Sequence, residues 1–288
     1  MSIQVRNLSY IYNAGMPDEQ KALDNVSFEV YDGQIAAVIG HTGSGKSTLV
    51  QHLNGLLKPT EGTIIVGDTD ITESGIAMRE IRQRVGLVFQ YPEYQLFEET
   101  VSADVAFGPK NLGLSESEIK ERVREALDLV GLNVDEIGER SPFELSGGQK
   151  RRVAIAGIIA MRPQVLILDE PTAGLDPGAH REIIRMIQKI HRREENIVIF
   201  VSHNMDDVAA LSDKILVMDR GQLMMSGTPS EIFRQRDRLA DAGLDLPSAA
   251  RLMLQLRTAG CEVPVDALTR DDAADELAEY LQEKSRKC

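Results

Sequence analysis

One stretch of the sequence carries the clearest structural signal: Gly40-His41-Thr42-Gly43-Ser44-Gly45-Lys46-Ser47-Thr48. Residues 34–39 before it form a short apolar run that predicts a buried strand. Residues 47–57 after it carry leucine and valine at helical spacing. A turn with the spacing glycine, four residues, glycine, lysine, serine between two such elements is typical of a phosphate-binding P-loop. The sequence therefore predicts a nucleotide-binding protein built around this loop.

The residue types in the loop suit a bound nucleotide. Glycines let backbone N–H groups close around phosphate oxygens, and the N-terminus of the following helix adds the positive end of its dipole. We expect the Lys46 ammonium to reach the β- and γ-phosphates and the Ser47 hydroxyl to ligate Mg²⁺. By itself the loop fits a kinase, a GTPase or a motor ATPase.

A second segment, Val165-Leu166-Ile167-Leu168-Asp169-Glu170, reads as a buried strand that ends in two carboxylates. Beside a P-loop in the same sheet, Asp169 is placed to orient Mg²⁺ near Ser47. Glu170 follows at the strand end, where its carboxylate can polarise water against the γ-phosphate. We therefore predict Glu170 as the catalytic base.

The rest of the pattern alternates short β-branched runs with amphipathic segments, which favours a mostly parallel α/β sheet. The predicted strands are residues 34–39, 85–89, 165–168, 197–201 and 214–218, and the predicted helices are residues 47–57, 116–130 and 179–190. Residues 219–222 predict a hairpin turn. Beyond residue 229 we predict only helices or loops, including residues 249–256 and 273–281. We therefore divide the chain into residues 1–229 and 230–288.

Composition and charge exclude several classes of protein. The 288 residues contain no apolar run near the roughly 20 residues of a membrane helix, and Met1 is not followed by a secretory signal. The net charge of −13, from 32 basic and 45 acidic residues, argues against a nucleic-acid partner. Cys261 and Cys288 cannot form a disulfide framework. We therefore predict a soluble or peripheral cytosolic protein.

The segment Leu145-Ser146-Gly147-Gly148-Gln149 opens a further predicted helix and offers a second set of free backbone amides. With this order of motifs, residues 3–228 closely resemble the ATP-binding cassette (ABC) ATPases. The resemblance implies ATP and Mg²⁺ as ligands. It also implies a P-loop NTPase fold with a mostly parallel RecA-like core sheet, an antiparallel β subdomain and a helical subdomain at about residues 100–160.

The same resemblance assigns roles to single residues. Tyr12 matches the aromatic that stacks on adenine, with Tyr10 as the competing candidate. Gln90 matches the Q-loop glutamine, which touches Mg²⁺ and senses a membrane partner, and Asp176 lies in a segment that resembles the D-loop. His203 matches the switch histidine that hydrogen-bonds the γ-phosphate. The residues expected to bind ATP are thus Tyr12, Gly40, His41, Thr42, Gly43, Ser44, Gly45, Lys46, Ser47, Thr48 and Gln90, and those expected to hold Mg²⁺ are Ser47, Gln90 and Asp169.

In ABC ATPases the signature loop of one subunit closes over ATP held by the P-loop of another. The resemblance therefore implies a dimer with a paralogous chain or with a second copy. The residues expected to act on the partner's ATP are Ser146, Gly147, Gly148 and Gln149.

A finer resemblance comes from residues 89–100, which are aromatic and acidic, and from the tail with Asp245-Leu246-Pro247 and residues 271–277. Both are similar to the ATPases of energy-coupling factor (ECF) transporters, the prokaryotic importers of vitamins and metal ions, and nearest to the second of their two paralogous ATPases. The resemblance implies three partners: a paralogous ATPase, a transmembrane coupling subunit and a membrane substrate-binding subunit. It places the chain at the cytoplasmic face of the cell membrane and makes residues 230–288 a dimer contact.

An acidic, aromatic groove after Gln90 would suit an arginine-bearing helix of the membrane partner, by charge pairing and cation–π contact. The residues expected to contact that partner are Tyr91, Tyr94, Phe97, Glu98 and Glu99. Two alternatives stay open, because they share the core motifs. One is the ATPase of a conventional ABC importer, and the other is a soluble ABC ATPase without a transport role.

Overall fold

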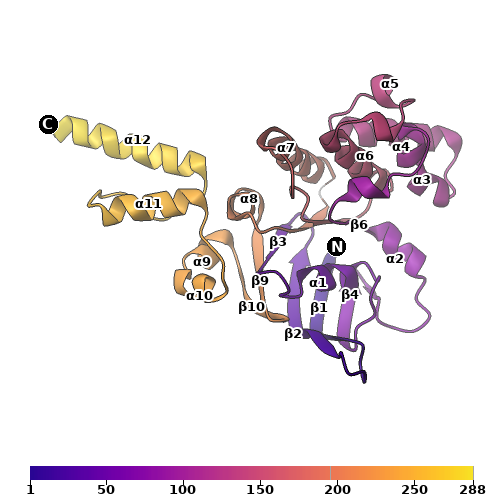
Figure 1. The fold of residues 1–288 in the computed structure, drawn as a ribbon, viewed down its shortest axis with the longest axis horizontal. Helices are drawn as coiled ribbons and strands as arrows, with labels where there is room; N and C mark the ends of the chain where they lie inside the picture. The colour runs from indigo at the N-terminus through magenta and orange to yellow at the C-terminus, as the bar shows by residue number, and fades with distance from the viewer. Residues whose placement is uncertain (195, 288) are drawn as a thin grey trace.

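The computed structural model describes residues 1–194 and 196–287 and contains two β-sheets with helices packed around them (Figure 1). The larger sheet has the strand order β10-β9-β3-β8-β7-β6. Strands β9, β3, β8, β7 and β6 run parallel, and β10 pairs antiparallel with β9. Their bounds are β3 (Ile35–Ile39), β6 (Val85–Val88), β7 (Val165–Asp169), β8 (Ile197–Val201), β9 (Lys214–Asp219) and β10 (Gln222–Gly227). Side chains of β3, β6, β7 and β8 are buried on both faces, which explains their unbroken apolar runs.

The smaller sheet is antiparallel, with the order β2-β1-β4-β5. Its strands are β1 (Ser2–Tyr12), β2 (Gln20–Tyr31), β4 (Glu61–Val66) and β5 (Thr69–Asp70). Together with helix α1 (Lys46–Leu53) it packs on one face of the larger sheet, where Leu23, Leu49 and Val38 share one apolar core. This packing brings the smaller sheet next to the P-loop.

Helices cover the opposite face of the larger sheet and continue into a helical subdomain. The helices between β5 and β9 are α2 (Met78–Arg84), η1 (Pro92–Gln95), α3 (Val101–Asn111), α4 (Glu116–Leu129), α5 (Val134–Ile137), η2 (Pro142–Glu144), α6 (Gly147–Ile159), α7 (Pro177–Glu194) and α8 (Met205–Leu211). Val153 on α6, Ile187 on α7 and Phe200 on β8 belong to one core, so the helical subdomain is joined to the sheet by continuous apolar packing.

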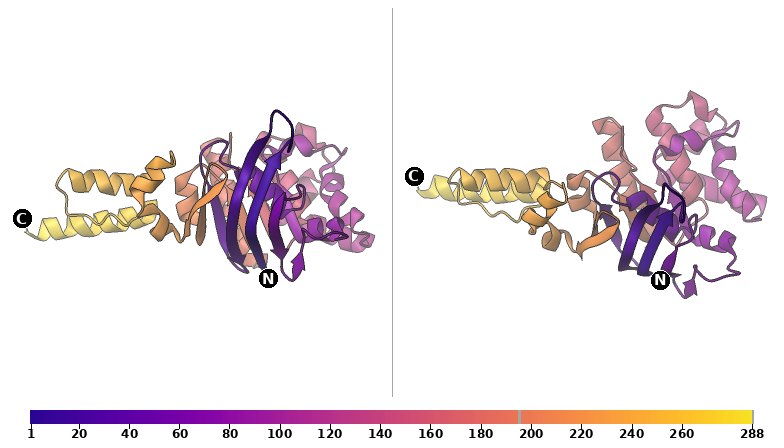
Figure 2. Two further views of the ribbon diagram at one scale, coloured as in Figure 1. Left: turned by 90° about the horizontal axis from the view of Figure 1, so that it is seen from below. Right: turned by 60° about the horizontal axis from the view of Figure 1, so that its bottom comes forward.

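The chain after β10 is helical, with α9 (Pro229–Phe233), α10 (Arg236–Asp241), α11 (Ser248–Thr258) and α12 (Arg270–Lys287). Phe233 and Leu239 still join the main core. Helices α11 and α12 instead lie side by side and project away from the sheets, on the side opposite α3–α6 (Figure 2). They share a separate small core of Ala249, Met253, Val263, Ala267 and Ala273.

The predicted strands of the larger sheet are confirmed to within one residue at each end. The helix predicted over residues 47–57 ends at Leu53, because the chain turns at Gly55, whose φ is 68°. Helix α7 begins at Pro177, before the predicted residue 179, because the Asp176 carboxylate accepts hydrogen bonds from the Gly178 and Ala179 N–H groups.

The hairpin turn is confirmed, with Arg220 and Gly221 at φ of 47° and 79°. The two predicted tail helices are confirmed as α11 and α12. No helix among the described residues is long and apolar enough to cross a membrane. Cys288 lies outside the described residues.

Candidate nucleotide-binding and catalytic site

Four neighbouring parallel strands deliver the predicted residues to one edge of the larger sheet. The P-loop follows β3, His203 follows β8, Asp169 and Glu170 stand at the end of β7, and Gln90 follows β6. Because the carboxyl ends of parallel strands open at the same edge, these side chains surround one cleft. The cleft has a volume of about 660 Å³, and its lining includes Tyr12, Thr42, Gly43, Gly45, Lys46, Ser47, Thr48, Gln90, Asp169, Glu170 and His203.

Two glycines of the P-loop occupy positions that a side chain could not share. A Cβ atom at Gly40, where φ is 153°, would lie 2.3 Å from the Met218 carbonyl oxygen and 2.5 Å from the Ser44 hydroxyl. A Cβ atom at Gly45, where φ is 100°, would lie 2.7 Å from the Ala22 carbonyl oxygen. Glycine is therefore required where the loop passes beneath β9 and against β2. Ser44 is fully buried, and its hydroxyl lies against Gly40.

Lys46 already points along the P-loop. Its ammonium donates hydrogen bonds to the carbonyl oxygens of Gly40, at 2.7 Å, and His41, at 2.8 Å. Burial lowers the pKa of Lys46, while the nearby Glu170 and Asp169 carboxylates act in the opposite direction. Phosphate oxygens at the loop can replace these carbonyls as acceptors, with the added attraction of opposite charges.

The oxygen atoms that Mg²⁺ prefers meet at one side of the cleft. The Ser47 hydroxyl is close enough to the buried Asp169 carboxylate to act against the rise of its pKa, and Gln90 lines the same cleft. Burial raises the pKa of Asp169 because its carboxylate loses hydration there, and a cation bound beside it would act in the opposite direction and favour the charged form. Among residues 1–194 and 196–287, no group of three or more His, Cys, Asp or Glu side chains forms a metal cage. The set of hydroxyl, amide and carboxylate fits Mg²⁺, which takes few protein ligands and completes its shell with phosphates and water.

Glu170 and His203 contact each other across the ends of β7 and β8. His203 Nδ1–H donates to Glu170 Oε2 at 2.8 Å, and the side chain of His203 is 74% exposed against 13% for Glu170. Glu170 has a φ of 51°, in the left-handed region, and its N–H donates to the Val201 carbonyl oxygen at 3.2 Å. A carboxylate held in this backbone conformation and faced by an exposed imidazole can take up a proton from water.

The two tyrosines considered for the adenine site lie differently. Tyr12 lines the cleft, and its hydroxyl lies 3.3 Å from the Thr48 hydroxyl. Tyr10 packs behind it, edge-on to Tyr12 with ring centroids 4.7 Å apart and edge-on to His52 at 4.6 Å. Tyr10 also packs against the core beneath the smaller sheet. The geometry therefore favours Tyr12 as the ring that faces a base.

Sequence reasoning missed several residues at this cleft. Lys21 and Arg220 both line it and add positive charge around a polyphosphate. They come together because the Asp24 N–H donates to the Gly221 carbonyl oxygen at 2.8 Å, which ties β2 to the β9–β10 turn. The turn itself is visible in the sequence, but no motif there marks Arg220 as a cleft residue.

The signature residues stand at a different cavity. Ser146 caps α6, since its hydroxyl accepts from the Gln149 N–H at 3.3 Å and its own N–H donates to Gln149 Oε1 at 3.0 Å. This second cavity is lined by Ser146, Gly147, Gly148 and Gln149 together with Asp176, Tyr91 and Tyr94. None of these seven residues lines the cleft that holds Lys46. The P-loop and the signature loop of one chain therefore do not meet.

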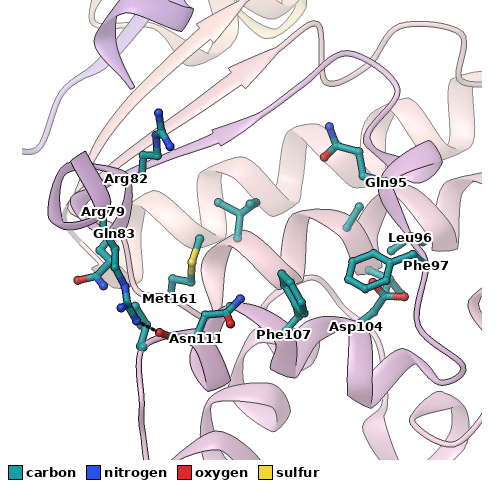
Figure 3. Close-up of a pocket in the computed structure, with 16 residues that line it drawn as sticks. Arg79, Arg82, Gln83, Gln95, Leu96, Phe97, Asp104, Phe107, Asn111 and Met161 are labelled. Atoms are coloured by element: carbon teal, nitrogen blue, oxygen red, sulfur yellow. Dashed lines mark hydrogen bonds between the residues drawn. The ribbon is translucent and has the colours of Figure 1, made fainter. Parts of the chain in front are cut away.

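A third cavity forms a groove between α2, α3, α6 and the end of η1 (Figure 3). Phe97 reaches into it and packs edge-on against Phe107, with ring centroids 5.0 Å apart. Asp104 lies at the same end, where its carboxylate accepts the Glu98 N–H at 3.0 Å and burial raises its pKa. Arg79 and Arg82 on α2 form the far wall.

The expectation of one acidic, aromatic groove after Gln90 is wrong. Phe97 lines the groove of Figure 3, whereas Tyr91 and Tyr94 line the signature cavity. Glu98 and Glu99 follow Phe97 and lead into α3, with Glu99 exposed. The groove also carries two arginines on its α2 wall, because α2 packs beside β6. Of the five predicted contact residues, Tyr91 and Tyr94 thus line one cavity and Phe97 lines another, while Glu98 and Glu99 line neither.

The fold and the cleft together define a P-loop ATPase of the ABC class. In agreement with this, the sequence pattern of the ABC transporter family matches residues 23–173. A solved dimeric ATP-binding cassette in a post-hydrolysis state, bound to ADP and Pi, superposes with a TM-score of 0.70 at 26% identity, over 79% of this chain and 98% of that one. The RecA-like sheet, the antiparallel subdomain and the helical subdomain that the resemblance implied are confirmed.

The particular branch of the family follows from full-length similarity. The energy-coupling factor transporter ATP-binding protein EcfA2 of Caldanaerobacter subterraneus subsp. tengcongensis is 55% identical over 98% of both chains. The structure of cbiO1 from Clostridium perfringens, described as part of the ABC transporter complex cbiONQ, has 38% identity and a TM-score of 0.74, covering 88% of this chain and 98% of that one. The chain belongs to the ABC transporter family, as an energy-coupling factor transporter ATP-binding protein that binds and hydrolyses ATP.

Proposed function

We propose that this chain drives uptake through an ECF-type importer as one of two cassettes, each completing the ATP site of the other. The separation of its two nucleotide-facing loops carries the proposal: Lys46 and Ser146 lie at different cavities. A second cassette, a paralogous chain or another copy, supplies the missing signature loop. Asp176, which lines the signature cavity, stands at the same junction. The projecting pair α11–α12 gives the two chains a second contact that does not depend on ATP.

Within each composite site we assign the chemistry to residues of the cleft. Lys46 and the P-loop amides hold the phosphates, and Tyr12 stacks on adenine. Ser47, Asp169 and Gln90 would hold Mg²⁺, which would neutralise phosphate charge when bound. Glu170 orients the attacking water and accepts its proton. His203, now bonded to Glu170, is exposed enough to turn toward the γ-phosphate once ATP is bound.

A dilution experiment tests the two-cassette proposal. Hydrolysis per mole of the dilute chain should rise when a second cassette is added, as more chain or as the paralogous ATPase. Ser146→Arg should abolish hydrolysis of ATP held by the second cassette, yet leave ATP affinity at its own P-loop unchanged, because the two loops do not meet in one chain. Ser117→Arg, on the exposed side of α4, is the matched control. Hydrolysis per mole that stays constant on dilution would contradict the proposal.

We further propose that the membrane coupling subunit inserts a helical segment into the groove of Figure 3. The groove offers apolar side chains for burial, with Phe97 and Phe107 at one end and charged residues at both ends. Such a groove fits an amphipathic helix. The chain would then sit at the cytoplasmic face of the membrane, held by integral partners. A separate membrane subunit would select the vitamin or metal ion.

Reversing the charge beside this groove should uncouple the motor. Asp104, Glu98 and Glu99 make the Phe97 end of the groove locally acidic, so basic residues of the partner helix should lie there. Glu98→Lys with Glu99→Lys introduces like-charge repulsion toward them, which can cost several kcal/mol at an interface, whereas a rim ion pair contributes only about 0.2–1 kcal/mol. Transport in proteoliposomes should fall much further than ATPase activity of the soluble pair. Glu121→Lys with Glu139→Lys, two exposed residues elsewhere on the helical subdomain, gives the same change in net charge as a control. Undiminished transport by the first pair would leave Phe97 as the better candidate contact.

A further inference from the structure

One arginine of the signature helix is buried, and each of its three guanidinium nitrogens donates at least one hydrogen bond. The side chain of Arg151 is 2% exposed. Its guanidinium pairs with both oxygens of Glu93, with Nε–Oε2 at 3.0 Å and Nη2–Oε1 at 2.8 Å. Nη1 donates to the carbonyl oxygens of Pro171, at 3.2 Å, and Ala173, at 2.7 Å. A buried charge is tolerated only with such partners, and the planar fork of arginine fits this arrangement where lysine would not.

These contacts join three segments that are far apart in the sequence. Arg151 belongs to α6, Glu93 belongs to η1 at a separation of 58 positions, and the carbonyls belong to the loop after Glu170. The Tyr91 ring adds a cation–π contact, with its centroid 5.7 Å from Arg151 Cζ. The segment after the Q-loop glutamine is therefore fastened to the catalytic loop through one side chain.

The backbone on both sides of this link is held in a conformation that non-glycine residues seldom adopt. Glu170 has a φ of 51° and Tyr91 a φ of 57°. Such conformations persist only where surrounding contacts fix them, and they gather at functional sites. Pro171 directly follows Glu170. The hydrogen bond from Arg151 to the Pro171 carbonyl oxygen therefore helps to fix the turn that orients the Glu170 carboxylate.

We propose that Arg151 is a positioning residue for ATP hydrolysis, linking η1 through Glu93 to the loop that aims Glu170. A displacement of η1 by a membrane partner moves the Glu93 carboxylate, the guanidinium and the two carbonyls together. Hydrolysis then responds to the partner although the partner never touches ATP. This inference rests on the role of Glu170 given under the proposed function.

The test uses the intact transporter complex carrying Arg151→Lys or Glu93→Gln. Arg151→Lys keeps the charge and loses the fork, and Glu93→Gln keeps the size of the side chain and loses the charge. Misplacement of a catalytic group by 1 Å can cost about 10²-fold, so we expect kcat to fall about tenfold for these milder changes. The KM and the affinity for a fluorescent ATP analogue should stay within about twofold, because binding residues are untouched.

Arg122→Lys is the matched control, because Arg122 also donates to two backbone carbonyls, of Ala160 and Met161 at 3.3 Å, within the helical subdomain. It should leave kcat within about twofold. Thermal unfolding of each variant reports whether it is folded. If Arg151→Lys does not fold, Glu93→Gln provides the same test. Normal kcat in a folded Arg151→Lys or Glu93→Gln complex would overturn the proposal.

A double-variant cycle separates positioning from a merely structural role. If Arg151 acts through Glu170, adding Arg151→Lys to Glu170→Gln should lower the residual rate no further. Suppose that Glu170→Gln alone is strongly impaired, and that Arg151→Lys lowers the rate by the same factor in the unaltered protein and in Glu170→Gln. That result would overturn the link between Arg151 and Glu170 but not the role of Glu170. Near-normal hydrolysis by Glu170→Gln would instead show that Glu170 is not the base, and the proposed role of Arg151 would fall with it. The two results therefore distinguish failure of the Arg151 proposal from failure of the proposed function.

Discussion

Glu170→Gln should bind ATP normally and nearly stop hydrolysing it. The carboxylate accepts a proton from water, whereas the amide cannot serve as that base. We expect turnover to fall at least about 10²-fold, the lower end of a general-base contribution. The amide keeps the shape of the side chain and can still bond His203, which the carboxylate contacts at 2.8 Å. ATP should then hold two cassettes closed, since the step that releases them is blocked.

The measurement is steady-state hydrolysis by the purified complex, with ATP binding followed by equilibrium titration. Glu121→Gln, an exposed carboxylate on α4, makes the same chemical change far from the cleft and should hydrolyse ATP at the unaltered rate. A Glu170→Gln complex that turns over ATP near the normal rate would remove Glu170 from its role as the base.

Lys46→Ala should fail at an earlier step, the binding of the nucleotide. It removes the one side-chain ammonium of the P-loop, which now lies 2.7 Å and 2.8 Å from two loop carbonyls. A hydrogen bond to a charged group contributes about 1.5–3 kcal/mol, which corresponds to roughly a 10- to 150-fold loss of affinity. Hydrolysis should fall at least as far.

Titration with a fluorescent ATP analogue measures this loss, and Lys58→Ala, an exposed lysine outside the cleft, is the control. Unchanged affinity in Lys46→Ala would mean that backbone amides and the helix N-terminus hold the phosphates alone.

The parallel sheet could be predicted from the sequence because its central strands are buried on both faces. Such strands are continuous apolar runs, as in residues 165–168 and 197–201. No simple apolar pattern marks the antiparallel strands β1 and β2, because charged and polar residues interrupt them and β-bulges break their register. Only the resemblance to a family implied that this subdomain was present.

The residues of the site likewise fall into those that the sequence predicts and those that only the structure reveals. Local motifs predicted Lys46, Asp169 and Glu170, and the family resemblance added His203. Each of them stands at or after the end of a strand, and the sheet order then gathers them. Glu93 shows the limit of that reasoning. In the sequence it resembles a free acidic residue beside aromatics, whereas in the structure it is the counter-ion of Arg151, 58 positions away. Pairing at that distance depends on tertiary packing, which no local pattern encodes.

The small core between α11 and α12 determines how easily these two helices unfold locally. Three of its five buried residues are alanines, so it removes little apolar surface from water compared with the cores around the larger sheet. Segments with few apolar contacts open at a low free energy, as separate cooperative units, while the rest of a protein stays folded. We therefore expect the helix pair to open as a cooperative unit of its own. A partner protein that covers the exposed Leu252 and Leu281 would stabilise the α11–α12 pair and slow amide exchange in these two helices. The opening of the nucleotide cleft would stay unchanged.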